Sequence, residues 1–521
     1  MSWLNMGEML HVNAHKFPNK MALKDAKGEV TFQELDLRTN RLANALLNLG
    51  LNPQDRFAAL CHNHIEYMEI YLAAAKAGLV VVPVSFRLVG KEIEYIIDNS
   101  ESKAIVVDER YVPTMRAFRS ELSLAFRSKL PKMNHVAIGS GNYSDFLNYE
   151  KIIAKAADSP PEVSVKPDDT WIQLYTSGTT GIPKGVVRSH RSYISFFLIN
   201  EVEFGFRYDD YGLVLMPLFH VNSTFYSFVF TYIGASCYIH RSIKFDAEEL
   251  LQIIDKEKIT YTSLIPTHYH LILSLPEEIK QKYDVSSIKQ LLTSSAPATK
   301  QMKLDVMQFF PNAALFEAYG STEAGLVTIL RPEDQMKKLG SIGRECVGTD
   351  IIKILDEKGN PVPQGEVGEL YSRGPMMFDH YWKLADKTTE SFQGEWFSAG
   401  DMARVDEEGY YYLVDRKANM IITGGEHVYP SELEELLCMH PKILETAVIG
   451  IPHPKWGEAV RAIIVLKERE TATEEEIINW CRGKIAGYKR PKSVVFISHE
   501  EMPRTASGKI MHKGCRDQYS D

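Results

Sequence analysis

The stretch best suited to chemistry is residues 175–185, which read Tyr-Thr-Ser-Gly-Thr-Thr-Gly-Ile-Pro-Lys-Gly. Its glycines allow backbone N–H groups to approach a ligand closely, and its hydroxyls can donate hydrogen bonds. Lys184 adds a positive charge, so the segment is suited to holding a polyphosphate. It differs from the Walker pattern because Ile-Pro separates Gly181 from Lys184. The alternative is a flexible surface loop, which a run of this order disfavours.

A second candidate segment is residues 317–323, which read Glu-Ala-Tyr-Gly-Ser-Thr-Glu. Tyr319 has a ring that can stack on a base, and Thr322 has a hydroxyl that can bond a phosphate. Glu323 can hold Mg²⁺, which usually takes one or two carboxylates together with ligand phosphates. The alternative is the start of a helix capped by Ser321 or Thr322, which this segment alone supports equally well.

Four further segments carry weaker signals. Residues 293–299 follow an expected strand and have side chains small enough for a flat ring to lie against the backbone. Asp401 and Arg416 can share a ribose diol, and residues 424–430 begin with two glycines that permit close approach to a ligand. Lys509 lies in a polar loop near the C-terminus. The alternatives are a capped turn, a turn aspartate with a surface arginine, a simple turn and a solvated lysine.

Composition and charge restrict the class of protein. The chain has 521 residues, of which 45% are hydrophobic and 24% charged. This length indicates more than one domain, since single cores seldom exceed about 250–300 residues. A net charge of −9 argues against a nucleic-acid-binding surface, and the six cysteines include no C-x-x-C pair that would indicate zinc. With neither a signal-peptide pattern nor an apolar run of about 18 residues, we expect a cytoplasmic enzyme without a transmembrane segment.

Helix and strand patterns alternate through the first 350 residues or so. Apolar spacing predicts helices at 31–49 and 65–78, and strands at 56–61, 80–83 and 104–107. Further strands are expected at 212–216, 236–239, 261–265 and 291–293. This alternation indicates a mostly parallel sheet and an α/β fold.

The pattern changes near residue 350, where short strands at 351–355, 368–372 and 409–415 predict a small β subdomain. A boundary is expected near 416–420, giving a large N-terminal α/β domain of residues 1–417 and a small α+β C-terminal domain of residues 418–521. The C-terminal domain is expected to hold helices at 431–439 and 473–484 and strands at 444–450, 459–467 and 492–498.

Taken in this order, the candidate segments resemble the adenylate-forming superfamily, which includes acyl-CoA synthetases, luciferases and the adenylation domains of peptide synthetases. The resemblance extends over essentially the whole chain and is most specific at residues 175–185. It implies that a carboxylate attacks the α-phosphate of ATP to give acyl-adenylate and pyrophosphate, after which a thiol displaces AMP. Fixed cations and donors are needed because two anions meet and charge builds on the phosphate oxygens.

The resemblance also assigns roles to residues of this chain. It implies catalytic roles for Lys184, Thr322, Glu323 and Lys509. Glu323 would bind Mg²⁺, and Lys509 would bridge the carboxylate and the α-phosphate before a mobile C-terminal domain rotates it away. The residues expected to hold ATP or AMP are Thr176, Ser177, Gly178, Thr179, Thr180, Lys184, Ser295, Ala296, Pro297, Tyr319, Gly320, Ser321, Thr322, Asp401 and Arg416.

Two positions depart from the family pattern. The hinge residue, two places after the ribose arginine, is Ala418 here, where Asp or Lys is usual. The common threonine before Gly-Asp is Ala399. Neither departure removes a catalytic group, and rotation at a hinge needs permissive torsions more than a charge.

The thiol acceptor is expected to be coenzyme A, and the candidate residues for it are Arg87, Gly424, Gly425, Trp456, Lys489 and Arg490. The residues expected to contact the acid are His220, Val221, Asn222, Ala318 and Gly320. The aromatic residues at 225–230 either line the acyl pocket or form a helix core. No Asp/Arg pair marks an amino-acid substrate. A fatty or other hydrophobic acid is favoured over an aromatic one.

An ATP-dependent acid–CoA ligase is therefore the favoured function, with Mg²⁺ as cofactor and ATP and coenzyme A as co-substrates. The alternatives are an adenylating enzyme that loads a separate carrier protein or oxidises its acyl group as luciferases do, and an aromatic-acid–CoA ligase. A non-catalytic nucleotide-binding regulator is least favoured because Lys509 and Glu323 are both present.

Overall fold

The computed structural model describes residues 5–121, 133–176, 182–241, 244–294, 298–504 and 509–520, with the side chains of 117–121 left out. The chain forms two compact units. The first comprises Met1–Thr176, Pro183–Ile351 and Ser372–Glu395, and the second contains Ile352–Tyr371 and Trp396–Asp521. The domain boundary expected between residues 417 and 418 stays a prediction.

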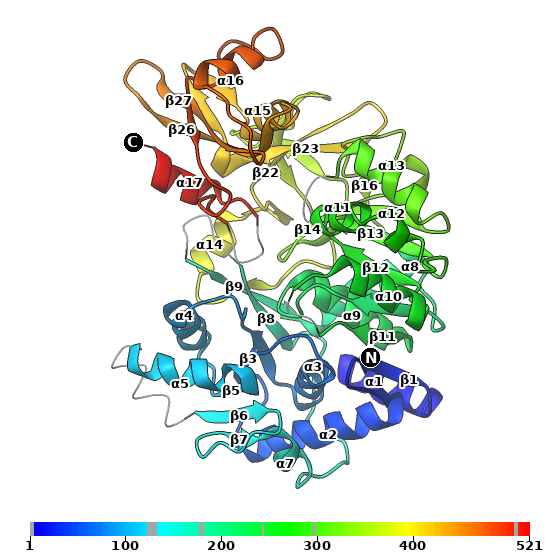
Figure 1. The fold of residues 1–521 in the computed structure, drawn as a ribbon. Helices are drawn as coiled ribbons and strands as arrows, with labels where there is room; N and C mark the ends of the chain where they lie inside the picture. The colour runs from blue at the N-terminus through cyan, green and yellow to red at the C-terminus, as the bar shows by residue number, and fades with distance from the viewer. Residues whose placement is uncertain are drawn as a thin grey trace. The chain divides into compact units, whose positions relative to one another are not determined.

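Two large sheets form the first unit (Figure 1). The strands of the first sheet, in spatial order over the described residues, are β16 (Arg344–Glu345), β15 (Gly325–Leu330), β14 (Ala314–Ser321), β13 (Gln290–Ser294), β12 (Tyr261–Leu264), β10 (Tyr211–Val214), β11 (Ser236–Ile239), β1 (Met21–Asp25) and β2 (Gly28–Thr31). Those of the second are β19 (His380–Tyr381), β9 (Lys184–Ser189), β8 (Thr170–Thr176), β4 (Val80–Pro83), β3 (Arg56–Leu60), β5 (Ala104–Asp108), β6 (Asn134–Ile138) and β7 (Leu147–Asn148).

Most central strand pairs in both sheets are parallel, whereas β15–β16, β14–β15, β1–β2, β8–β9 and β9–β19 are antiparallel. Crossover helices join the parallel strands, as parallel pairing requires. The helices of this unit are α1 (Met6–Lys16), α2 (Phe32–Asn48), α3 (Ile65–Ala77), α4 (Gly90–Ser100), α5 (Val112–Glu121), α7 (Tyr149–Ile153), α8 (His190–Phe204), α9 (Val221–Ile233), α10 (Ala247–Glu257), α11 (Pro266–Leu273), α12 (Glu277–Lys280), α13 (Lys300–Phe309) and α14 (Ala385–Glu390). The predicted α/β fold is thereby confirmed.

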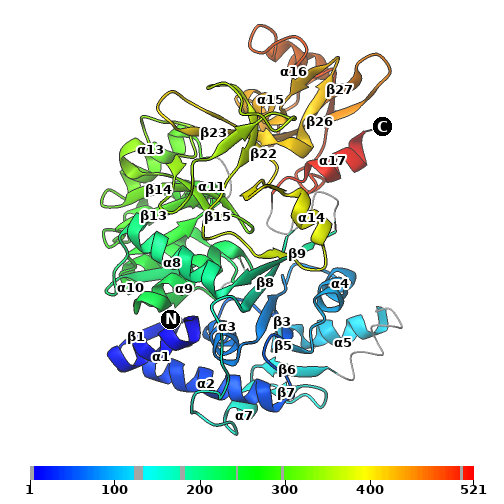
Figure 2. The ribbon, with the colours of Figure 1, turned by 180° about the vertical axis from the view of Figure 1, so that it is seen from behind.

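Successive apolar side chains of a strand in this unit pack on opposite faces of the sheet, against different helices. In β3, Phe57 and Ala59 belong to the central core, whereas Ala58 and Leu60 pack against α4 and α5 on the opposite face. The outer face of the nine-stranded sheet packs against α10, α11 and α13, which Figure 2 shows from behind. Successive side chains of a strand point to opposite faces, so strands buried on both faces are apolar throughout.

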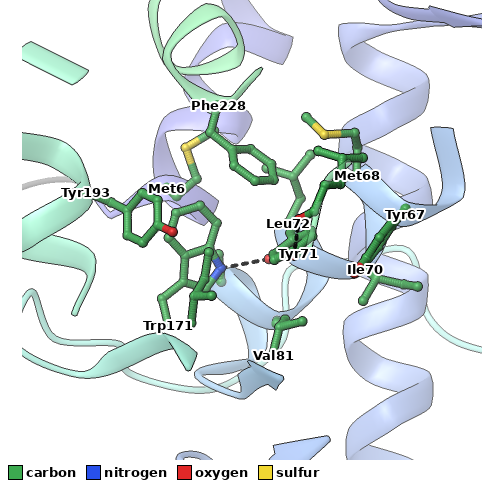
Figure 3. Packing of buried hydrophobic residues seen from close by; sticks show 14 of the residues in the cluster. Met6, Tyr67, Met68, Ile70, Tyr71, Leu72, Val81, Trp171, Tyr193 and Phe228 are labelled. Carbon is green, nitrogen blue, oxygen red and sulfur yellow. Dashed lines mark hydrogen bonds between the residues drawn. The ribbon is translucent and has the colours of Figure 1, made fainter. Parts of the chain in front are cut away.

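The central core anchors the strand that leads into the glycine-rich loop. Trp171 on β8 is fully buried, and its indole N–H donates to the carbonyl of Tyr71 on α3 at 2.9 Å (Figure 3). The rings of Phe228 on α9 and Tyr193 on α8 meet the indole edge-on, with centroids 5.1 and 4.9 Å away. Such packing holds β8, α3 and α9 in fixed positions, which a loop that binds a ligand requires.

Smaller sheets form the second unit. A four-stranded sheet runs β17 (Lys353–Leu355), β18 (Gly368–Tyr371), β22 (Asp401–Val405) and β23 (Tyr411–Arg416). A five-stranded sheet contains β25 (Glu426–Val428), β24 (Ile421–Thr423), β27 (Gly457–Leu466), β26 (Ile443–His453) and β28 (Ser493–Phe496). The helices are α15 (Pro430–Cys438), α16 (Glu474–Trp480) and α17 (His512–Tyr519).

In the part of the chain that the structure describes, no helix has the length and apolar character needed to cross a membrane.

Candidate active site

The glycine-rich segment connects two antiparallel strands. Thr176, at the end of β8, lies opposite Lys184, at the start of β9. The predicted phosphate-binding residues Ser177, Gly178, Thr179 and Thr180 lie outside the described residues. The described ends of the segment therefore place a hydroxyl and an ammonium at facing positions of one hairpin.

Tyr381 links two of the predicted catalytic residues. Its hydroxyl donates to Glu323 Oε1 at 2.9 Å, and Lys184 Nζ lies over its ring, 4.5 Å from the centroid. Tyr381 is 4% exposed and belongs to β19, where it pairs with Val186 of β9. Tyr381 was not among the residues expected from the sequence, because its position depends on a pairing of strands that are distant in the sequence.

Residues 317–323 form a β-hairpin and not a helix start, so the alternative of a helix capped by Ser321 or Thr322 is wrong. β14 ends at Ser321 and pairs with β15 in antiparallel fashion, and the Ser321 hydroxyl accepts from the backbone N–H of Ala324 at 2.9 Å. The turn thus presents Thr322 and Glu323 at one end of the sheet.

A buried arginine fixes this turn. Arg188 on β9 is fully buried, and it donates to the carbonyls of Thr322 at 2.6 Å and of Met376. The backbone N–H of Phe378 donates to the carbonyl of Glu323 at 2.6 Å. Burial lowers the pKa of Arg188 from its ordinary value, and the nearby groups Tyr193, Asp379 and Glu323 oppose that shift. Arg188 therefore acts on the backbone of the turn and leaves the Glu323 carboxylate available for other partners.

The geometry around Glu323 is compatible with Mg²⁺. Within the described ranges, no group of three or more His, Cys, Asp or Glu side chains could enclose a metal ion. Mg²⁺ prefers one or two protein carboxylates supplemented by substrate phosphates and water, so a single carboxylate beside a lysine is a suitable donor set. Glu323 could serve as that carboxylate.

The predicted acyl residues lie at the start of α9. His220 is its N-terminal cap residue, and Val221 and Asn222 form its first turn. The Asn222 amide donates to the hydroxyls of Ser263 on β12 and Ser294 on β13, at 3.0 and 3.1 Å. Asn222 thus joins α9 to the carboxyl ends of two parallel strands, where ligands of open α/β sheets commonly bind.

Two small residues predicted to make room for the acid lie nearby on β14. Ala318 pairs with Ser294, the last described residue before the predicted adenine residues Ser295, Ala296 and Pro297, which lie outside the described residues. Gly320 has a different reason for being small. A Cβ atom at this position would lie 2.0 Å from the carbonyl oxygen of Gly325, so the hairpin itself requires glycine.

The segment before α9 is held by residues that the sequence analysis missed. Asn63 donates to the carbonyl of Met216 at 2.9 Å and accepts from the backbone N–H of Leu218 at 2.8 Å. The Tyr71 hydroxyl donates to the carbonyl of Leu218 at 2.7 Å. These bonds fix residues 216–218 and thereby the direction in which α9 begins.

The predicted ribose and lysine residues come together in the second unit. Arg416 Nε lies 2.6 Å from Asp401 Oδ1, and the two residues are paired across β22 and β23. Its Nη1 donates to the carbonyl of Ala399 at 2.8 Å. Desolvation of the Lys509 ammonium and the positive charge of Arg416 lower the pKa of Lys509, and the negative charge of Asp401 partly opposes this shift. This grouping puts a carboxylate and two cations within electrostatic reach of one another.

Three of the predicted coenzyme A residues also meet. Gly424 and Gly425 form the turn between β24 and β25, with φ angles of 61° and 87° that favour glycine. The backbone N–H of Gly424 donates to the carbonyl of Trp456 at 2.8 Å. The indole stacks on His453 at 4.2 Å, and Lys492 Nζ, which the sequence analysis missed, lies 5.6 Å from its centroid.

The other predicted coenzyme A residues are not part of this group. Lys489 donates to Glu432 at 2.6 Å, and Arg490 is half-buried. Arg87 is exposed on the first unit. Burial, with smaller contributions from Arg87 and another histidine, lowers the pKa of His268 to about 4, so Arg87 lies near a neutral imidazole.

Comparison with known proteins decides the family. The family model described as AMP-binding enzyme matches residues 10–382, and that described as AMP-binding enzyme C-terminal domain matches residues 432–509. The chain belongs to the AMP-binding enzyme family. The predicted resemblance to adenylate-forming enzymes is confirmed.

Relatives within the AMP-binding enzymes include acid–CoA ligases of different specificity. A feruloyl-CoA synthase from Amycolatopsis sp is 33% identical over 509 residues, which are 97% of either chain. A long-chain-fatty-acid–CoA ligase of Mycobacterium tuberculosis is 32% identical over 522 residues, 99% of either chain. The structure of an anthranilate–CoA ligase with anthranoyl-AMP aligns with a TM-score of 0.87 at 28% identity, covering 99% of this chain and 97% of that one.

Proposed function

We propose that the protein is an ATP-dependent acid–CoA ligase that converts a hydrophobic carboxylic acid into acyl-AMP and pyrophosphate and then transfers the acyl group to coenzyme A. The observation that carries the proposal is the contact of Tyr381 with both Lys184 and Glu323, in a chain of the AMP-binding enzyme family. A cation and a carboxylate held by one buried residue form a suitable cradle for a metal-bound polyphosphate.

Each residue has a defined task in this proposal. Lys184 neutralises phosphate charge, and Thr322 donates a hydrogen bond to phosphate. Glu323 would hold Mg²⁺, which when bound neutralises the pyrophosphate as it leaves. Charge is greatest on the phosphate oxygens in the transition state, so fixed cations lower the barrier there more than they strengthen substrate binding.

Residues of the second unit serve the nucleotide and the reacting carboxylate. Asp401 and Arg416, already paired at 2.6 Å, would hold the ribose hydroxyls. Lys509 would bridge the acid carboxylate and the α-phosphate in the first step. The lowered pKa of Lys509 reflects desolvation and the positive charge of Arg416. The negative charge of a bound phosphate would raise that pKa again and so favour the ammonium form.

A second candidate substrate class, aromatic acids, is favoured by the similarity of the chain to a feruloyl-CoA synthase and to an anthranilate–CoA ligase. Transfer to a carrier protein is the alternative second step. A cytoplasmic location, the rotation of the C-terminal domain and the coenzyme A contacts all stay predictions.

The decisive assay measures pyrophosphate release over a panel of aliphatic and aromatic acids, with and without coenzyme A. We expect AMP as the product, acyl-CoA formation, and loss of activity in Lys184→Ala and Glu323→Gln. Lys282→Ala is a matched control, because Lys282 pairs with Glu248 on the surface. Acid-dependent ADP formation would refute the proposal, and thioester formation solely on a carrier protein would favour the alternative.

A further inference from the structure

A small cavity lies between α9 and the strands β10 and β12. It has a volume of about 10 Å³ and is lined by Asn222, Tyr226, Phe230, Tyr261 and Ser263, among others. Tyr226, Phe230 and Tyr261 belong to the same central core as Phe225 and Phe228, which do not line the cavity. Asn222 is a predicted contact of the acid, so the cavity adjoins the proposed acyl site. Its volume admits a single water-sized group and neither a ring nor a chain.

The cavity is lined by a tyrosine, Tyr261, whose hydroxyl makes no hydrogen bond of normal geometry within the described residues. Tyr261 is 1% exposed, although the Ser263 side chain is close enough to its hydroxyl to oppose the rise in its pKa slightly. Its ring lies among other rings, with centroids 5.4 Å from Phe230 and 5.7 Å from Tyr226. Burial raises the pKa of Tyr261 well above its ordinary value, so the hydroxyl stays neutral and can both donate and accept.

Ser263 also lines the cavity, and its side chain interacts with that of Tyr261. The Ser263 hydroxyl accepts from Asn222 at 3.0 Å, and Asn222 also donates to Ser294. A buried hydroxyl without a hydrogen-bond partner destabilises the folded protein. A ligand oxygen atom that hydrogen-bonds to the hydroxyl would remove that penalty. The rings leave room for one small group in contact with Tyr261.

We propose that Tyr261 binds a hydroxyl at the far end of the acid, so that the preferred substrates are acids with an oxygen remote from their carboxylate. The inference rests on the proposed ligase function. A methyl group in the same place would leave the Tyr261 hydroxyl unpaired, and a site built to bond a hydroxyl discriminates strongly against analogues that lack it. Occupation by a water molecule alone is the competing outcome.

The experiment pairs every acid that the panel shows to be active with its analogue hydroxylated at the far end, for example cinnamate with 4-hydroxycinnamate. For the wild-type protein we expect kcat/KM for pyrophosphate release to be about 5- to 100-fold higher for the hydroxylated member of the best pair, as one buried hydrogen bond implies. In Tyr261→Phe the ratio should fall to within about twofold of unity.

Tyr269→Phe is the matched control. It removes another fully buried tyrosine hydroxyl, which donates to the carbonyl of Leu292 at 3.2 Å and does not line the cavity. This control should keep the wild-type ratio and lose some thermal stability, whereas Tyr261→Phe should lose less, because the Tyr261 hydroxyl makes no protein hydrogen bond of normal geometry within the described residues.

The outcomes separate the two proposals. If no acid is activated, the proposed function fails and this inference fails with it. If acids are activated but hydroxylation brings no gain, or if Tyr261→Phe retains the gain, the ligase function stands and the inference is overturned. The latter result would assign the cavity to water.

Discussion

Replacing Tyr381 by phenylalanine isolates one hydrogen bond at the proposed phosphate site. The variant keeps the ring beneath Lys184 and removes the hydroxyl that donates to Glu323 at 2.9 Å. A hydrogen bond to a charged group contributes about 1.5–3 kcal/mol. Glu323 is partly exposed, so water can replace the lost donor. We therefore expect the lower end, about 1.5 kcal/mol or roughly a tenfold loss of kcat/KM for adenylation.

The assay is acid-dependent pyrophosphate–ATP exchange at several Mg²⁺ concentrations, together with calorimetric binding of Mg-ATP. Tyr381→Phe should need more Mg²⁺ for half-maximal exchange and should bind Mg-ATP more weakly, while KM for the acid changes little. Tyr412→Phe is the control, because it removes a hydroxyl that donates to another carboxylate, Asp406, at 3.2 Å.

A double-mutant cycle tests whether Tyr381 acts through Glu323. In a Glu323→Ala background the hydroxyl has lost its acceptor, so adding Tyr381→Phe should have less than about a twofold effect. An undiminished tenfold effect in that background would refute the reasoning. A Tyr381→Phe variant as active as the wild-type protein would refute it as well.

Three further predictions concern the second unit. Lys509→Ala should slow adenylation by about 10²–10³ in single-turnover assays while sparing thioester formation from supplied acyl-adenylate, and parallel loss in a well-folded variant would contradict the assigned role. Gly425→Leu should slow thioester formation more than adenylation; equal loss would instead indicate backbone strain, since φ is 87° and a Cβ would meet no described atom within 4 Å. Burial opposes the protonation of His512, but its contact with Glu434 at 2.7 Å outweighs burial and raises the pKa. The stability from this pair should be fully present below about pH 6.5 and be lost as the pH rises through the folded-state pKa, so His512→Gln should lower the melting temperature more at pH 6 than at pH 9. A difference independent of pH would contradict it.

Helices and strands that are marked by apolar periodicity within a short segment could be predicted from the sequence. The strand expected at 56–61 is β3, and the helix expected at 65–78 is α3. The helix expected at 473–484 ends earlier, since α16 stops at Trp480 and Gly483 adopts a φ of 73°. Apolar periodicity identifies an element but gives its ends poorly, because a turn and a last helical turn can share the same residues.

Residues that act through distant strand pairing were missed for a different reason. Tyr381 and Arg188 lie in an ordinary tyrosine-tryptophan pair and an ordinary strand, and nothing next to them marks a site. Their roles arise because β19 pairs with β9 and because Arg188 reaches the turn after β14. A loop motif can be recognised from residues that are adjacent in the sequence. The residues that orient the loop come from other strands and depend on sheet register, which a single sequence does not reveal.

At both positions that depart from the family pattern, Ala399 and Ala418, the main-chain carbonyl accepts a hydrogen bond from an arginine. Ala399 lacks the hydroxyl of the common threonine, yet its carbonyl accepts from Arg416 at 2.8 Å. Ala418 lacks a charged side chain, yet its carbonyl accepts from Arg516 at 3.1 Å. A main-chain carbonyl is present whatever the side chain, so each arginine keeps an acceptor that substitution cannot remove. Arg416, which is predicted to bind the ribose, is thus oriented by the backbone as well as by Asp401, and the predicted hinge keeps a contact with a charged side chain of α17.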